Sequence, residues 1–174
     1  MIRGYANNGF WEDALGLYYE MSRHGLQPDG CTFPCALKSC ASLGSSALWQ
    51  GKEMHHCVIR CGLECDLFVG NFRMMMYAKC GSVEYARQVF GKIPQTDVVS
   101  WNAIIGGYAQ NGEKDKALIL FQQMEMESVK PDVVKIVSIL LVCVILVDLQ
   151  QVKEVHESML ESLFVACFLH LINK

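Results

Sequence analysis

The sequence predicts an all-α fold, a right-handed α-solenoid of stacked helix-turn-helix repeats. Three observations predict it. The chain of 174 residues repeats itself, and within each repeat the apolar residues fall at helical spacing. The composition agrees, because 52% of the residues are hydrophobic and only 19% are charged. That balance excludes a disordered chain and suits a protein built mostly of buried helix faces.

The repetition is clearest between residues 1–29 and 104–132, which align without a gap. Twelve aligned positions are identical, whereas roughly two would agree by chance. A third copy lies between them, since the pattern Tyr-x3-Gly-x4-Ala-x3-Phe/Tyr begins at Tyr5, Tyr77 and Tyr108. The longer interval between the first two copies leaves room for one more unit at 30–66.

Each unit is predicted to be an antiparallel pair of helices. In 98–132, apolar residues at helical spacing mark a first helix through Tyr108, which Asn111-Gly112 ends because glycine accepts the left-handed cap geometry. A second apolar series through Phe121 marks the partner helix, which Pro131 ends. One such pair cannot bury its apolar faces alone, so neighbouring pairs must stack.

Charge and cysteine usage exclude several classes. A net charge of −3 and a pI near 5.9 do not suit a generic basic nucleic-acid binder. The nine cysteines contain no Cys-x-x-Cys, which favours small buried apolar side chains in a reducing compartment. The alternative is a metal site made of His55, His56, Cys57 and Cys61, but no second ligand pair is placed to complete a tetrahedron.

No targeting or membrane segment is predicted. The first residues carry neither a secretory signal peptide nor a transit peptide rich in Arg and Ser. The apolar segment 133–149 is interrupted by Lys135 and Asp148. Its uninterrupted part is shorter than the ~20 residues that a membrane span needs, so a buried helix is the preferred interpretation.

Two segments carry a family resemblance. Val-Val-Ser-Trp-Asn-Ala-Ile-Ile-Gly-Gly-Tyr at 98–108 and Met-Tyr-Ala-Lys-Cys-Gly-Ser-Val-Glu-Tyr-Ala-Arg-Gln-Val-Phe at 76–90 resemble plant pentatricopeptide repeat proteins. The alternating unit lengths resemble the PLS subfamily. The resemblance implies a single array over 1–174, with a partial P-type unit at 1–29, an L-type unit at 30–66, an S-type unit at 67–97, a P-type unit at 98–132 and a degenerate partial L-type unit at 133–174.

The resemblance implies sequence-specific binding of single-stranded RNA, about one base per repeat. In the family, an Asn early in the first helix and the last residue of the unit bind the base edge. The matching pairs here are Asn71 with Asp97 and Asn102 with Asp132. Such pairs resemble a combination that prefers uridine, with cytidine second. The apolar residue three positions before each Asn stacks on the bases, which implicates Phe68 and Val99.

The remaining units match the base-reading pattern of the family less well. The L-type unit carries Asp66, but Pro34 stands where the reading Asn would be, and proline has no side-chain polar atom. The first unit keeps Asp29 without its Asn, and the last has Val137 at that place. Lys79 is a candidate for a phosphate contact. The plain alternative is that Asp29, Asp97 and Asp132 only cap the helices that follow them.

The implied role is an adaptor in organellar RNA processing, including C-to-U editing, in a mitochondrion or chloroplast. The implied partners are RNA, RNA-editing factors or other repeat proteins, without a membrane, cofactor or small-molecule substrate. Catalysis is not expected, because a deaminase needs His-x-Glu with a distant Pro-Cys-x-x-Cys, and His156-Glu157 lacks the intervening residue. The alternatives are a protein-binding helical scaffold or a non-functional truncated fragment, since Met1 falls inside a predicted helix and 162–169 is apolar.

Overall fold

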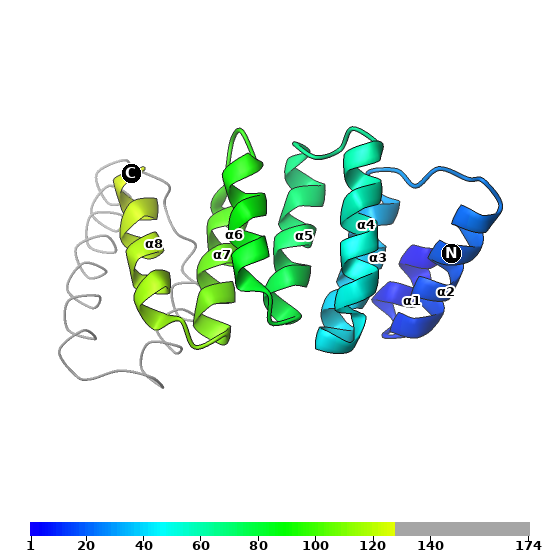
Figure 1. Ribbon diagram of the computed structural model, residues 1–174, viewed down its shortest axis with the longest axis horizontal. Coiled ribbons are helices and arrows are strands. Elements are labelled where there is room, and N and C mark those ends of the chain that lie inside the picture. The colour runs from blue at the N-terminus through cyan, green and yellow to red at the C-terminus, as the bar shows by residue number, and fades with distance from the viewer. Residues whose placement is uncertain (128–174) are drawn as a thin grey trace, which may run out of the picture. The chain divides into compact units, whose positions relative to one another are not determined.

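The computed structural model describes residues 1–127, and all regular structure in that range is helical (Figure 1). These residues lie within one compact unit, Met1–Pro131. The predicted unit at 133–174 lies outside the described residues, and so do Asp132 and Val137. Within 1–127 the predicted all-α architecture of stacked helix pairs is confirmed.

The helices follow one another as four pairs. The first pair is α1 (Ile2–Asn7) and α2 (Trp11–Arg23), and the second is α3 (Thr32–Leu43) and α4 (Leu48–Arg60), joined by the short 3-10 helix η1 (Gly44–Ala47). The third is α5 (Leu67–Lys79) and α6 (Val83–Lys92), and the fourth is α7 (Val98–Gln110) and α8 (Lys114–Met126).

The turns and helix ends show how well local signals work. Gly112, predicted to end the first helix of its unit, has a positive φ angle of 81° two residues past the end of α7, and Gly81 has a φ angle of 76° at the same place after α5. Pro131 is the predicted stop of the second helix in the fourth pair, and α8 ends before it, at Met126 with Glu127 as its cap.

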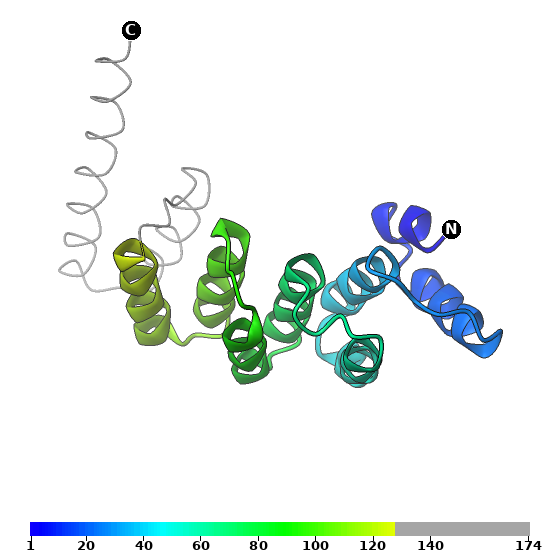
Figure 2. The same ribbon diagram turned by 90° about the horizontal axis from the view of Figure 1, so that it is seen from above.

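The helices form two layers. Seen from above, α1, α3, α5 and α7 follow one another along one side of the unit, and α2, α4, α6 and α8 follow along the other (Figure 2). Each first helix packs against the first helix of the next pair. Each second helix packs against its own partner, and α2, α4 and α6 also pack against the first helix that follows. A central first helix such as α5 is therefore covered by several neighbours.

The closest approach between first helices is made by small residues. A Cβ atom placed on Gly107 of α7 would lie 2.8 Å from the Cβ of Ala78 on α5. Asn111 strengthens the same contact, because its side-chain Nδ2 donates to the Ala78 carbonyl at 2.9 Å and to the Gly107 carbonyl at 2.7 Å. These contacts hold the carboxyl end of α7 against α5.

A buried polar network joins α4 to α5. The fully buried Arg73 donates to the Glu64 carbonyl at 3.0 Å and to His55 Nε2, while His55 Nδ1 and the Tyr77 hydroxyl lie 2.7 Å apart. Burial, followed by the charge of Arg73, lowers the pKa of His55 to about 4, so the ring is neutral at pH 7. Because Nε2 accepts from Arg73, the ring proton belongs on Nδ1 and is donated to Tyr77.

This network bears on the alternative metal site. Both ring nitrogens of His55 are engaged in hydrogen bonds within the fold. Over residues 1–127, no group of three or more His, Cys, Asp and Glu side chains is arranged to hold a metal ion. As to membranes, each helix within that range is too short or too polar to span one.

The adjacent glycines Gly106 and Gly107 allow a matched test of the packing between α5 and α7. A Cβ at Gly106 would meet no atom within 4 Å, so Gly106→Ala should raise the free energy of unfolding through higher helix propensity. Gly107→Ala gains the same propensity but overpacks against Ala78. Chemical denaturation should therefore place Gly107→Ala about 1–3 kcal/mol below Gly106→Ala in stability. Equal stabilities would contradict the close approach.

Candidate nucleic-acid interface

Three aspartates stand at the starts of the first helices. Asp66 and Asp97 are the N-caps of α5 and α7, and their Oδ1 atoms accept from the backbone N–H groups of Val69 and Ser100, each at 2.8 Å. Asp29 precedes α3, and its Oδ1 accepts from the Thr32 N–H at 2.7 Å. The capping role considered as the plain alternative is therefore present at Asp97, whereas the N-cap of α3 is Cys31 and Asp29, two residues earlier, accepts from the Cys31 and Thr32 N–H groups.

Asp97 does more than cap, because it also reaches the preceding unit. The Nδ2 atom of Asn71, on α5, donates to Asp97 Oδ1 at 3.4 Å. The hydroxyl of Ser100 lies 2.7 Å from Asn71 Oδ1 and 2.9 Å from Asp97 Oδ1. The backbone N–H of Asp97 in turn donates to Ser100 Oγ at 3.4 Å, which completes a reciprocal capping box. The structure thus brings Asn71 and Asp97 together, as the family resemblance implies.

The cluster orients the Asn71 amide. Its oxygen lies toward the Ser100 hydroxyl and its nitrogen toward the Asp97 carboxylate, and the reverse orientation would place two oxygens together. One N–H and one lone pair of the amide are then left for a further partner. Asn71 is only 9% exposed, so a ligand meets a fixed edge of the amide rather than a mobile side chain.

The contacts of Asp97 also determine its protonation state. Burial works to raise the pKa of this carboxyl, but the hydrogen bonds from Ser100 and Asn71 outweigh it, and the pKa lies below its ordinary value. Asp97 is therefore ionised at neutral pH and acts only as an acceptor. The Asp97 carboxylate therefore accepts from the Asn71 N–H, and it would repel the amide oxygen of Asn71 if the amide were turned round.

Asn102 occupies the corresponding position one unit later, on α7. Both polar atoms of its side-chain amide are buried and have no hydrogen-bond partner in the described part of the chain. Asp132, which the resemblance pairs with it, lies outside the described residues. A buried polar group without a partner costs about 1–3 kcal/mol, so this amide favours a partner that supplies both a donor and an acceptor.

Exposed apolar side chains stand beside the two asparagines. Phe68 and Val99 are each the second residue of their helix, α5 and α7, and they are 57% and 47% exposed. Phe68 also makes an edge-to-face contact with Phe72, with ring centroids 5.1 Å apart. Large apolar groups at matching places on successive helices provide flat surfaces on which planar ligands can stack.

The other candidate residues are not brought into an Asn–Asp cluster. Pro34 is buried in α3 and offers no polar side-chain atom near Asp66. Asp29 is occupied by the amide groups at the start of α3, and its hydrogen bond from the Thr32 hydroxyl lowers its pKa. Lys79 is exposed at the last position of α5, where its amine is open to solvent.

Sequence reasoning missed Ser100. Its hydroxyl is fully buried and links the cap of α7 to Asn71, which lies on another helix. The local signal was present, since Asp97 and Ser100 have the three-residue spacing of a capping box. The contact with Asn71 has no local signal, because it depends on how α5 packs against α7.

Comparisons with known proteins agree with this architecture. Residues 96–134 match a family model described as the PPR repeat family, and residues 1–26 match a model described as the PPR repeat. A chloroplastic pentatricopeptide repeat-containing protein of Arabidopsis thaliana is 40% identical over 90% of this chain. A mitochondrial one from the same plant is 35% identical over 94% of this chain. The chain covers only 18% and 23% of these two relatives.

Solved structures show the same fold. The pentatricopeptide repeat protein PPR10 in complex with an 18-nucleotide psaJ RNA element superposes with a TM-score of 0.66, at 21% identity. The structure of PPR10 from maize superposes with a TM-score of 0.59, also at 21% identity. Both matches cover 82% of this chain and 21% of the other.

The buried Ser100 hydroxyl should contribute measurably to stability. Ser100→Ala removes the reciprocal cap bond and leaves Asn71 Oδ1 without its donor, so the free energy of unfolding should fall by about 1–2 kcal/mol. Ser82 is the matched control, because it is the N-cap of α6 without a side-chain cap bond. Ser82→Ala should change stability by less than about 0.5 kcal/mol in the same denaturation series. Equal losses would show that the hydrogen bonds of the Ser100 hydroxyl contribute nothing measurable to stability.

Proposed function

We propose that the chain binds single-stranded RNA along the layer of first helices. One observation carries the proposal: Asn71 is held by Asp97 and Ser100 in a fixed orientation, beside an exposed Phe68. This combination offers a stacking surface and a directed hydrogen-bonding edge, which are the two features that recognition of an unpaired base requires. The matched PPR repeat segments and the RNA complex of PPR10 support the same function.

Each Asn–Asp pair reads one base in this proposal. A base stacks on Phe68 or Val99, and its Watson–Crick edge meets the free N–H and lone pair of the neighbouring Asn. A uracil edge supplies a donor and acceptors side by side, which matches an amide that offers one of each. The proposed preference of Asn71 with Asp97 and of Asn102 with Asp132 for uridine, with cytidine second, rests on the family resemblance of these pairs.

Phosphate contacts play a small part. The chain carries a net charge of −3, so long-range attraction does not drive binding. Lys79, exposed at the end of α5, is the residue proposed to contact the RNA backbone. Affinity then comes from stacking and hydrogen bonds summed over successive units, and two complete reading pairs give weak binding.

The biological role proposed for the chain is that of a non-catalytic adaptor. It selects a site in an organellar transcript for processing such as C-to-U editing, with editing factors or other repeat proteins as partners. Support comes from relatives that are named as chloroplastic or mitochondrial. Because the chain spans about a fifth of the relatives' length, it would supply part of a longer recognition surface.

Gel-shift titration with uridine-rich and purine-rich oligonucleotides at low salt tests the proposal. Asn71→Ala and Asn102→Ala should each reduce the preference for the uridine-rich strand, and Phe68→Ala should weaken binding to both. A lost stacking or base contact corresponds to roughly tenfold in the dissociation constant. The controls lie on α8, where Gln122→Ala and Ile119→Ala change exposed residues of the other layer.

Two results would overturn this function. If Asn102→Ala leaves binding to the uridine-rich strand unchanged, the asparagines do not read bases, and a protein-binding scaffold becomes the better interpretation. If the α8 controls weaken binding as much as Phe68→Ala, the RNA does not follow the layer of first helices. Thermal melts of each variant separate these outcomes from loss of the folded state.

A further inference from the structure

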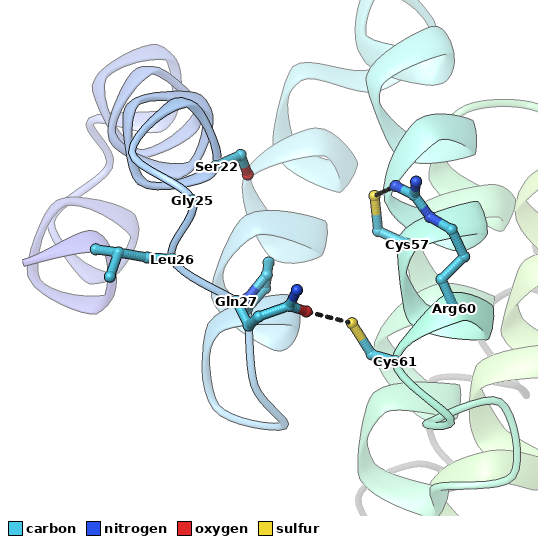
Figure 3. A pocket seen from close by; sticks show the side chains of 8 residues that line it. Ser22, Gly25, Leu26, Gln27, Cys57, Arg60 and Cys61 are labelled. Carbon is cyan, nitrogen blue, oxygen red and sulfur yellow. Dashed lines mark hydrogen bonds between the residues drawn. The ribbon is translucent and has the colours of Figure 1, made fainter.

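A second site lies away from the asparagine clusters, between the end of α2 and the end of α4. A pocket of about 320 Å³ is lined there by Ser22 and residues 25–28 on one side and by Cys57, Arg60 and Cys61 on the other. Figure 3 shows Cys61, the cap residue of α4, opposite Gln27 of the loop, and the Arg60 guanidinium beside Cys57. A volume of this order is enough for a small peptide-like ligand.

The two cysteines of the pocket are in different chemical situations. Cys57 Sγ accepts a hydrogen bond from the Arg60 guanidinium at 3.0 Å, whereas Cys61 Sγ donates to Gln27 Oε1 at 3.7 Å (Figure 3). The Arg60 guanidinium is a permanent cation, so it stabilises negative charge that develops on the Cys57 sulfur when that sulfur reacts. The Gln27 amide oxygen offers no such positive charge to Cys61. Cys57, the sulfur in contact with a cation, is therefore the better placed nucleophile of the pair.

A buried phenol adds a second donor beside Cys57. Tyr18 is 3% exposed, and its hydroxyl has no hydrogen-bond partner among the described residues that meets ordinary geometry. Burial and then the neighbouring Cys57 sulfur raise the pKa of Tyr18, so the hydroxyl keeps its proton at neutral pH. The Tyr18 phenol is thus a neutral group in the neighbourhood of the Cys57 sulfur.

The other described cysteines lack this environment. Burial raises the pKa of Cys35 and Cys80, and raises that of Cys40 to about 12. Cys31 and Cys65 are exposed, so they are accessible thiols that line no part of this pocket. They provide internal controls for the effect of the pocket on thiol chemistry.

The pocket also selects the charge of a ligand. Among the described residues that line it, Arg60 is the one with a charged side chain, and its guanidinium is largely exposed. The guanidinium carries five N–H donors, so contact with Cys57 leaves others for a carboxylate. The ligand that fits is a small thiol compound with carboxylate groups.

We propose that Cys57 is a site of S-thiolation by small carboxylate-bearing disulfides of the glutathione class, with Arg60 binding a carboxylate of the incoming molecule. The Cys57 thiolate attacks one sulfur of the disulfide, the original S–S bond breaks, and a new S–S bond to Cys57 forms. The departing thiolate takes a proton from water, and the proton of Cys57 goes to solvent. The disulfide is the oxidant, and it is reduced to one free thiol.

The test treats the full chain with glutathione disulfide and follows the adduct at each cysteine by peptide mapping and mass spectrometry. Cys57 should react at least about tenfold faster than Cys31 and Cys65. Arg60→Gln should slow the reaction at Cys57 by about tenfold and leave Cys31 and Cys65 unchanged. Cys61→Ser should leave the rate at Cys57 unchanged, and Cys57→Ser should remove the adduct from the pocket.

A charge-inverted probe checks the carboxylate contact. Cystamine, a disulfide that carries two amines, should react more slowly than glutathione disulfide at Cys57, and Arg60→Gln should remove that preference. Equal rates at Cys57, Cys31 and Cys65, or an Arg60→Gln variant that reacts as fast as the parent, would overturn the proposal. These readouts do not depend on RNA binding, so they stand apart from the function proposed above.

Discussion

The packing of each first helix against the next first helix is the contact on which the rest of the structure depends. Between α5 and α7 it requires that Gly107 have no side chain, because a Cβ there would lie 2.8 Å from the Cβ of Ala78. At the other end of the same two helices, this close approach brings Asn71 within hydrogen-bonding distance of Asp97 and Ser100. A larger residue at Gly107 would therefore act on the asparagine cluster as well as on the core.

Asp97 has a position in the chain that lets one carboxylate serve two units. By sequence it ends the third unit, but physically it begins α7, where it caps the exposed N–H groups of the first turn. From there it also accepts from Asn71 of α5. The hydrogen bond that stabilises the helix start and the contact that orients the Asn71 amide thus use the same Asp97 oxygen.

Much of the fold could be predicted from the sequence, because its determinants are local and repeated. The helix pairs followed from apolar spacing, and the turns at Gly81 and Gly112 followed from the conformation that glycine allows. The end of α8 could be predicted only as lying before Pro131, because a proline stops a helix without fixing which residue is the last helical one.

The site was only partly predictable. Asn71 and Asp97 were paired through the family resemblance, and the structure brings them together. Ser100 was missed because its contact with Asn71 spans two helices. The contact of Arg60 with Cys57 was missed because helical spacing alone does not show where a long side chain turns.

The central claim is that Asn71 and Asp97 act as one reading unit, held by the packing of α5 on α7. A double-mutant cycle in RNA affinity tests it most directly, with Asn71→Ala, Asp97→Asn and the double variant measured on strands that differ in one uridine. Asparagine still caps a helix, so Asp97→Asn changes the partner of Asn71 without removing the cap. The account predicts a coupling energy of about 1 kcal/mol or more for uridine discrimination. If the losses of uridine discrimination in the two single variants simply add up in the double variant, the account is contradicted.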